Sequence, residues 1–178
     1  MTLPRLNAVG FCAHYSLEGD WAFDYALSLS RLHAIRLNVF HFLTDPYDPD
    51  DAPPNYLSKD QRTRLIVDRE RELRMYYDSR AGDYLEVGFR LCADNEWTEL
   101  HRCLLIREFQ VLVLGYVGRD ATFAGKPIEA FADSFVCPVI LVGPDGPQQF
   151  HLNKPAALYP NRFGLPRHKW QPIASLAG

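Results

Sequence analysis

This sequence lacks the features by which disulfide-bonded, metal-binding, membrane and secreted proteins are usually identified. Its four cysteines form no Cys-x-x-Cys pair, and three of them lie within apolar runs. We therefore expect buried, reduced thiols that pack as small hydrophobic side chains. No apolar run approaches the ~18 residues needed to cross a bilayer, and the first seven residues lack the pattern of a signal peptide. These absences predict a cytoplasmic protein with no membrane partner.

The sequence also lacks a strong excess of charge of either sign. The net charge is −3, and no dense Lys/Arg block or basic stripe with interleaved aromatic residues occurs, so no nucleic-acid partner is expected. The signatures GxSxG, HExxH and GxxxxGK[ST] are absent as well. We nominate no catalytic residue, and an enzyme is the less favoured hypothesis. No metal site is predicted either, because prolines break the spacing of the aspartates at 45, 48, 50 and 51.

What the chain does contain is a regular alternation of two patterns. Of its 178 residues 47% are hydrophobic, which suits a single domain with a full core. Short apolar runs, typical of strands buried on both faces, lie at residues 6–13, 35–43, 84–92, 111–116 and 138–142. The third run alternates apolar and polar residues, which favours a half-exposed edge strand.

Helical periodicity separates these runs, at residues 19–32, 58–80, 95–109 and 126–135. Asp20 or Gly19 is expected to begin the first helix, Ser58 the second, and Pro127 falls in the first turn of the last. The order of elements is β-α-β-α-β-α-β-α-β. This alternation predicts an α/β fold, a doubly wound five-stranded parallel sheet with helices on both faces.

Two segments fall outside the alternation. Residues 44–55, rich in proline and aspartate, must form a loop, and their place after the second strand puts them at the carboxyl edge of the sheet, where ligands of such folds bind. The end of the chain has six prolines and several aromatic residues without periodicity. We predict an α/β domain over residues 1–144 and an irregular, extended C-terminal arm over 145–178, packed on its own domain or on a partner subunit.

A more specific pattern begins where the fourth run ends. Gly115, Gly118 and Arg119 give G-x-x-G-R, Gly125 follows, and the step Cys137-Pro-Val leads into the last run. This order resembles the end of universal stress proteins, and the likeness extends over roughly residues 5–144. The resemblance implies strand order 3-2-1-4-5, a homodimer often paired through the last strand, and, in some members, bound ATP.

The resemblance also implies a site. Glycines let backbone N–H groups approach phosphate oxygens, and the following helix start favours an anion. His14 stands where the family has an acidic residue near the nucleoside, and Phe42 matches the apolar residue near the adenine. The expected site for an adenine nucleotide (ATP or AMP) or a related anion is His14, Phe42, Gly115, Gly118, Gly125 and Lys126.

Two departures from the ATP-binding pattern keep other hypotheses open. Six residues separate Gly118 from Gly125 where the family has nine, and Lys126-Pro127 replaces a Ser or Thr. The glycines then either cradle phosphate, with Lys126 supplying charge, or simply turn the chain. In the second case the protein acts through protein–protein contacts. A third hypothesis is an enzyme of the wider nucleotide-alpha-hydrolase-like group that uses ATP to activate a substrate.

Overall fold

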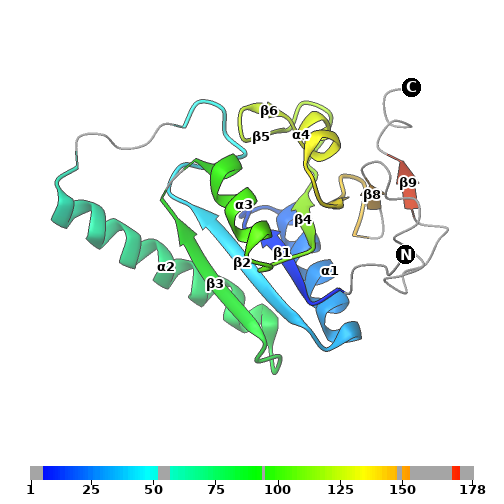
Figure 1. Ribbon diagram of the computed structural model, residues 1–178, viewed down its shortest axis with the longest axis horizontal. Helices are drawn as coiled ribbons and strands as arrows, with labels where there is room; N and C mark the ends of the chain where they lie inside the picture. The colour runs from blue at the N-terminus through cyan, green and yellow to red at the C-terminus, as the bar shows by residue number, and fades with distance from the viewer. Residues whose placement is uncertain (1–5, 52–56, 94, 148–149, 153–169, 173–178) are drawn as a thin grey trace.

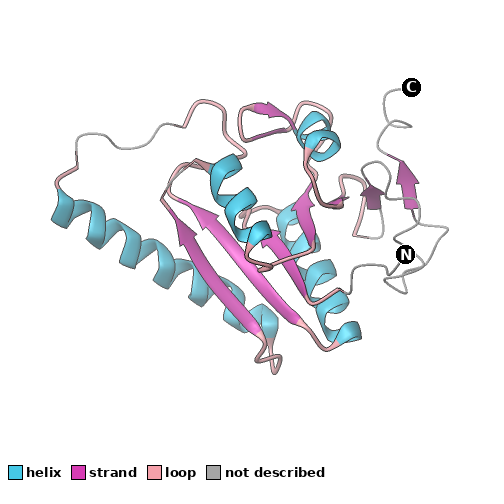
Figure 2. Ribbon diagram, viewed as in Figure 1, coloured by secondary structure: helices cyan, strands magenta, loops and turns pink. Residues whose placement is uncertain are grey.

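The computed structural model describes residues 6–51, 57–93, 95–147, 150–152 and 170–172. Its centre is a parallel sheet (Figures 1 and 2). The five parallel strands are β1 (Ala8–Cys12), β2 (Arg36–Phe42), β3 (Val87–Cys92), β4 (Val111–Gly115) and β7 (Val139–Val142). They lie in the order β3-β2-β1-β4-β7. The predicted order 3-2-1-4-5 is confirmed, and so is the edge position of the third strand.

Helices cover both faces of this sheet, as predicted. They are α1 (Leu17–His33), α2 (Lys59–Ala81), α3 (Glu96–Leu105) and α4 (Ile128–Ser134). Buried residues of α1 and α2 form one cluster with the sheet, and those of α3 and α4 form another on the opposite face. Within the described residues, no helix combines the length and apolar character required to span a membrane.

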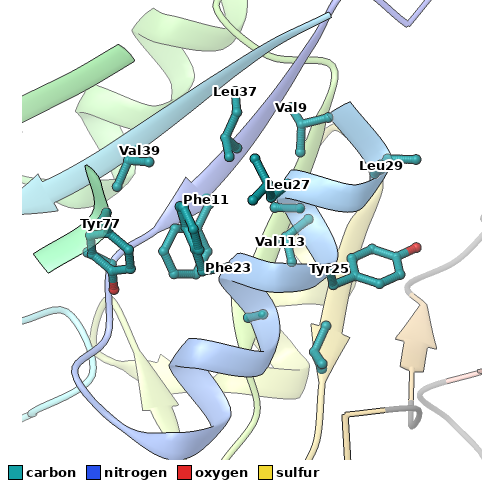
Figure 3. Packing of buried hydrophobic residues seen from close by; sticks show 14 of the residues in the cluster. Val9, Phe11, Phe23, Tyr25, Leu27, Leu29, Leu37, Val39, Tyr77 and Val113 are labelled. Carbon is teal, nitrogen blue, oxygen red and sulfur yellow. The ribbon is translucent and has the colours of Figure 1, made fainter. Parts of the chain in front are cut away.

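The core on the α1 side is built around aromatic rings (Figure 3). Phe11 of β1 packs edge-on against Phe23 of α1 and Tyr77 of α2, each at a centroid distance of 5.6 Å. Because side chains alternate along a strand, Cys12 points to the other face and joins the second cluster. All four cysteines are buried thiols outside any disulfide, as predicted. Burial raises the pKa of Cys92 to about 12 and that of Cys103 to about 11, so both remain protonated.

The helix ends follow local capping chemistry. Helix α2 begins at the predicted Ser58, whose hydroxyl forms a capping box with Gln61. The predicted start of α1 at Gly19 or Asp20 is wrong, because the Ser16 hydroxyl accepts the Gly19 N–H at 2.9 Å and caps the helix earlier. Helix α3 ends at Leu105, four residues before the predicted 109. It ends there because the chain turns at Arg107, which adopts φ 64°.

The predicted helix over 126–135 is wrong at its start. Lys126 and Pro127 form strand β6 (Lys126–Pro127), which pairs antiparallel with β5 (Thr122–Phe123). Ala124 and Gly125, at φ 53° and 78°, make the two-residue turn between them. Pro127 itself is extended, with ψ 135°, so α4 starts only at Ile128.

The structure adds two strands to the predicted C-terminal arm. β8 (Phe150–Leu152) pairs antiparallel with β7, and β9 (Trp170–Pro172) pairs parallel with β8. His151 is buried, and its Nε2 lies 2.8 Å from the carbonyl oxygen of Gly143. The described part of the arm therefore continues the main sheet past β7. The other aromatic residues of the arm, Tyr159 and Phe163, lie outside the described residues.

Candidate functional site

A cleft of about 540 Å³ opens at the carboxyl edge of the sheet, beside the ends of β1 and β4. These adjacent strands send their connections in opposite directions along the sheet, which makes this the topological switch point where open α/β sheets bind ligands. Three segments line the cleft, one after β1, one after β2 and one after β4. The lining residues are His14, Tyr47, Pro49, Val117, Gly118, Arg119, Asp120, Ala121 and Thr122.

One wall of the cleft is a pair of stacked rings. The imidazole of His14 lies 4.1 Å from the ring of Tyr47, centroid to centroid, at an interplanar angle of 28°. His14 Nδ1 shares a hydrogen bond of 2.7 Å with the Ser16 hydroxyl. The Tyr47 hydroxyl donates to the carbonyl oxygen of Cys12 at 3.1 Å. Both rings are therefore held in place from outside the cleft.

Burial keeps both rings uncharged near neutral pH. It lowers the pKa of His14 from its ordinary 6.5, although Asp45 and Glu18 pull in the opposite direction. It raises the pKa of Tyr47 well above its usual value of 10. The two rings are then neutral, and a neutral aromatic ring suits stacking against a planar group.

The proline-rich loop carries Tyr47 to this position. Asp45 Oδ1 accepts the N–H of Tyr47 at 2.9 Å, and Asp51 Oδ2 accepts the N–H of Asp45 at 2.7 Å, so these aspartates close turns. The loop also contacts the β5–β6 hairpin, since the Ala124 N–H donates to the Pro46 carbonyl at 2.9 Å. The predicted loop at the carboxyl edge is confirmed for residues 44–51. No group of three His, Cys, Asp or Glu side chains that could hold a metal occurs in the described part of the chain.

A further part of the cleft lining comes from the segment after β4. A Cβ built on Gly118 meets no heavy atom within 4 Å, so the space beside it is open. Arg119 and Asp120 follow and add one charge of each sign to the cleft. The cleft thus combines a neutral aromatic side with a polar side that holds a guanidinium.

Comparisons with known proteins extend this description. The sequence matches no family model and no curated protein. Among solved structures, a protein of the universal stress protein family from Burkholderia pseudomallei aligns with TM-score 0.54 at 17% identity, over 76% of this chain and 95% of that one. A universal stress protein in complex with cAMP aligns with TM-score 0.51 at 17% identity, over 78% of this chain and 97% of its own.

This chain has the universal stress protein fold. The resemblance found in the sequence is thereby supported at the level of architecture. The alignments cover most of this chain and nearly all of each solved structure, so the likeness is not confined to one motif.

On this universal stress protein fold, two of the six residues predicted for the site line the main cleft, His14 and Gly118. Gly115 is buried at the end of β4, where a Cβ would lie 2.9 Å from the Gly19 backbone nitrogen, so its small size serves the contact with α1. Phe42 is 3% exposed and belongs to the core on the α3 side. It also borders a smaller pocket of about 120 Å³ that shares His14 with the main cleft.

Gly125 and Lys126 are not among the residues that line the cleft. Gly125 occupies the tight turn of the β5–β6 hairpin, and its φ of 78° explains the glycine there. The ammonium of Lys126 lies 4.4 Å above the Trp97 ring. Gly125 and Lys126 thus belong to the β5–β6 hairpin, and their predicted role in holding a phosphate stays a prediction.

Seven of the nine lining residues were not among the predicted site residues, and Tyr47 and Arg119 are the two of these on which the account of the cleft depends. Arg119 stands in the G-x-x-G-R pattern itself, so its position next to Gly118 was a usable signal. Tyr47 is the one aromatic residue between the prolines of the loop after β2, and only the folded loop places it beside His14.

Proposed function

We propose that this chain is a universal stress protein-like stress-response protein that binds an adenine nucleotide, such as ATP or AMP, or a related anion. The ligand lies in the cleft at the carboxyl edge of the sheet. The observation that carries the proposal is the cleft itself, with the His14–Tyr47 stack on one side and Gly118-Arg119 on the other. Its volume of about 540 Å³ lies within the usual range for small-molecule sites. A structural neighbour of the same fold is a complex with cAMP, which makes an adenine nucleotide the first ligand to test.

The two walls suit the two ends of a nucleotide. A purine base is flat and stacks on neutral aromatic rings, which the pKa directions of His14 and Tyr47 favour. A phosphate group pairs with a guanidinium through charge-assisted hydrogen bonds, and Arg119 places one in the cleft. Gly118 leaves space for a ligand to approach the backbone closely.

Calorimetric titration with ATP, AMP and cAMP tests this proposal. We expect saturable binding to the wild-type chain and binding at least tenfold weaker for Gly118→Val, because the added side chain enters the cleft. Gly146→Val is the matched control, since Gly146 also faces open space but does not line the cleft. Equal affinity for both variants, or no heat with any of the three nucleotides at millimolar concentration, would reject the proposal.

We further propose that the protein works in the cytoplasm as a homodimer. β8 occupies the edge of β7 with three antiparallel residue pairs. A dimer that keeps β8 in place must use another surface, or two chains must exchange the β8 segment. Light scattering of the full chain should give twice the 20.4 kDa of one chain. A mass of one chain at all micromolar concentrations would exclude the homodimer.

A second candidate is a family member that binds no nucleotide and acts through protein–protein contacts. It is favoured by the position of Gly125 and Lys126, which form the β5–β6 hairpin rather than a phosphate loop. The same titration separates the two candidates. Absence of nucleotide binding together with a fully folded protein would favour the interaction protein.

A further inference from the structure

The α3-side face of the sheet is polar at the amino-terminal ends of β2 and β3. Alternation along β2 places Arg36 and Asn38 on the same face as the buried Phe40. In β3, Gly88 is paired with Asn38, and Arg90 is paired with Phe40. Residues at these positions would be apolar if a helix covered them.

Helix α3 is too short to cover this part of the sheet. It has 10 residues and crosses near the carboxyl ends of β2 and β3, and in Figure 1 the amino-terminal ends of both strands extend beyond it. A pocket of about 300 Å³ lies there. It is lined by Asn7, Ala8, Arg36, Asn38, Gly88, Phe89, Arg90, Arg107 and Glu108. This pocket is at the opposite edge of the sheet from the nucleotide cleft.

The pocket carries an excess of positive charge. Three arginines line it against one carboxylate, that of Glu108, which gives a formal charge of 3 − 1 = +2. Glu108 forms an ion pair with Arg90. Within the described ranges, neither Arg36 nor Arg107 has a carboxylate partner. Two guanidinium groups therefore remain to attract an anion.

Arg36 is held over the pocket by a short chain of hydrogen bonds. Its Nε donates to Asn38 Oδ1 at 2.9 Å, and Asn38 Nδ2 donates to the carbonyl oxygen of Glu108 at 2.6 Å. A Cβ on Gly88 would overlap the Arg36 guanidinium, so the glycine lets this group lie against the strand. The Nε donor is used by Asn38, and the end of the guanidinium remains free for an oxyanion.

Arg107 is held there at a conformational cost. The Glu108 N–H donates to the Cys103 carbonyl and the Arg107 N–H to the Leu104 carbonyl, which is the Schellman pattern at the end of α3. Arg107 occupies the position of this motif where glycine is usual, at φ 64°. Capping alone does not explain an arginine at this position, whose side chain lines the pocket.

We propose that this pocket is a second anion-binding site, which takes inorganic phosphate or the phosphate group of a small metabolite. Planar guanidinium groups match phosphate oxygens in bidentate geometry, and two of them balance a dianion. The pocket volume is at the lower end for small-molecule sites, which suits a phosphate group with a short organic portion. The site is independent of the nucleotide cleft.

Amide chemical-shift titration with inorganic phosphate and with phenyl phosphate tests the proposal. We expect saturable shifts of the Gly88 and Glu108 amides in the wild-type chain. Arg107→Gly should weaken binding about tenfold or more, because one charge-assisted contact is lost. The same variant should keep or raise the melting temperature, since glycine suits the position, so a loss of binding cannot be assigned to misfolding.

Three further arms sharpen the test. Arg36→Gln should also weaken binding, whereas Arg64→Gln, at an exposed position of α2 outside the pocket, should not. Arg119→Gln should leave the shifts unchanged, which separates this site from the nucleotide cleft.

Tighter binding of phenyl phosphate than of phosphate identifies an organic ester as the ligand, and the reverse identifies the free ion. Shifts that stay linear to about 50 mM of either probe, or equal loss in Arg64→Gln, would overturn the proposal.

Discussion

The ring of His14, directly after β1, stacks on the ring of Tyr47 in the loop after β2, with centroids 4.1 Å apart. The Tyr47 hydroxyl reaches back to the carbonyl oxygen of Cys12, at the end of β1. The two residues therefore fix the loop to the sheet and form one wall of the cleft at the same time. Changes to either ring should affect stability and ligand binding in separable ways.

Tyr47→Phe and Tyr47→Ala separate these two roles. The phenylalanine variant keeps the stacked ring but loses the hydrogen bond to Cys12, so we expect unfolding to become easier by about 1 kcal/mol with nucleotide affinity nearly unchanged. The alanine variant removes the wall, and we expect a loss of affinity of tenfold or more. Urea denaturation and calorimetric titration measure the two effects. Equal affinity of the alanine variant would show that the ring does not contact the ligand.

The protein should lose stability as the pH falls below about 6.5, because three of its histidines are partly or fully buried. Burial lowers the pKa of His14, His41 and His151 below the ordinary 6.5. Below that pH the unfolded chain binds protons that the folded chain does not, so the free energy of unfolding decreases toward the folded pKa values. Above it these groups are neutral in both states and contribute no slope.

Urea denaturation between pH 7.5 and pH 5 measures this dependence. The double variant His14→Gln, His41→Gln should show a shallower loss of stability over the same interval. An unchanged slope in the double variant would assign the pH dependence to other groups.

Two glycines, Gly19 and Gly118, should differ strongly in their tolerance of alanine. A Cβ on Gly19 would overlap the backbone carbonyl of His14, so Gly19→Ala should cost about 2–3 kcal/mol of stability. Gly118 faces open space, and Gly118→Ala should change the stability by less than about 0.5 kcal/mol. Thermal denaturation of both variants checks this contrast. Similar melting temperatures would mean that the β1–α1 turn is not packed as described.

Ala34→Gly should stabilise the protein. Ala34 follows α1 with φ 51°, and its N–H donates to the Arg31 carbonyl. An L-residue in this left-handed conformation costs roughly 1 kcal/mol, part of which glycine recovers despite its more flexible unfolded chain. We expect the free energy of unfolding to rise by about 0.5 kcal/mol in urea denaturation. A decrease would indicate that this turn relaxes in solution.

The fold was largely predictable because its signals are local. The apolar runs and the helical periodicity identify the five parallel strands and the four helices that cover them. The end of α3 and the start of α4 were not predictable, because each depends on a residue with unusual backbone geometry. Arg107 takes the place of a capping glycine, and Gly125 closes a hairpin that has only two residues in each strand. Neither feature changes the hydrophobic periodicity of the sequence.

The position of the cleft was predictable, but only part of its lining was. The switch point follows from strand order, and His14 and Gly118 lie there. Gly125 and Lys126 continue a motif in sequence, yet in the folded chain they form the turn and the second strand of the β5–β6 hairpin. The side chains of Asp45 and Thr122 form hydrogen bonds with the Tyr47 backbone and hold this residue beside the cleft. These hydrogen bonds exist only in the folded loop.

Amide chemical-shift mapping with ATP tests the proposed function most directly, because it locates the ligand as well as detecting it. The proposal predicts saturable shifts of the Gly118, Arg119 and Thr122 amides, around the cleft. It also predicts that these shifts disappear in Gly118→Val and persist in Gly146→Val. Absence of shifts in residues 117–122, with or without shifts around Gly88 and Arg107, would contradict a nucleotide site at the carboxyl edge of the sheet.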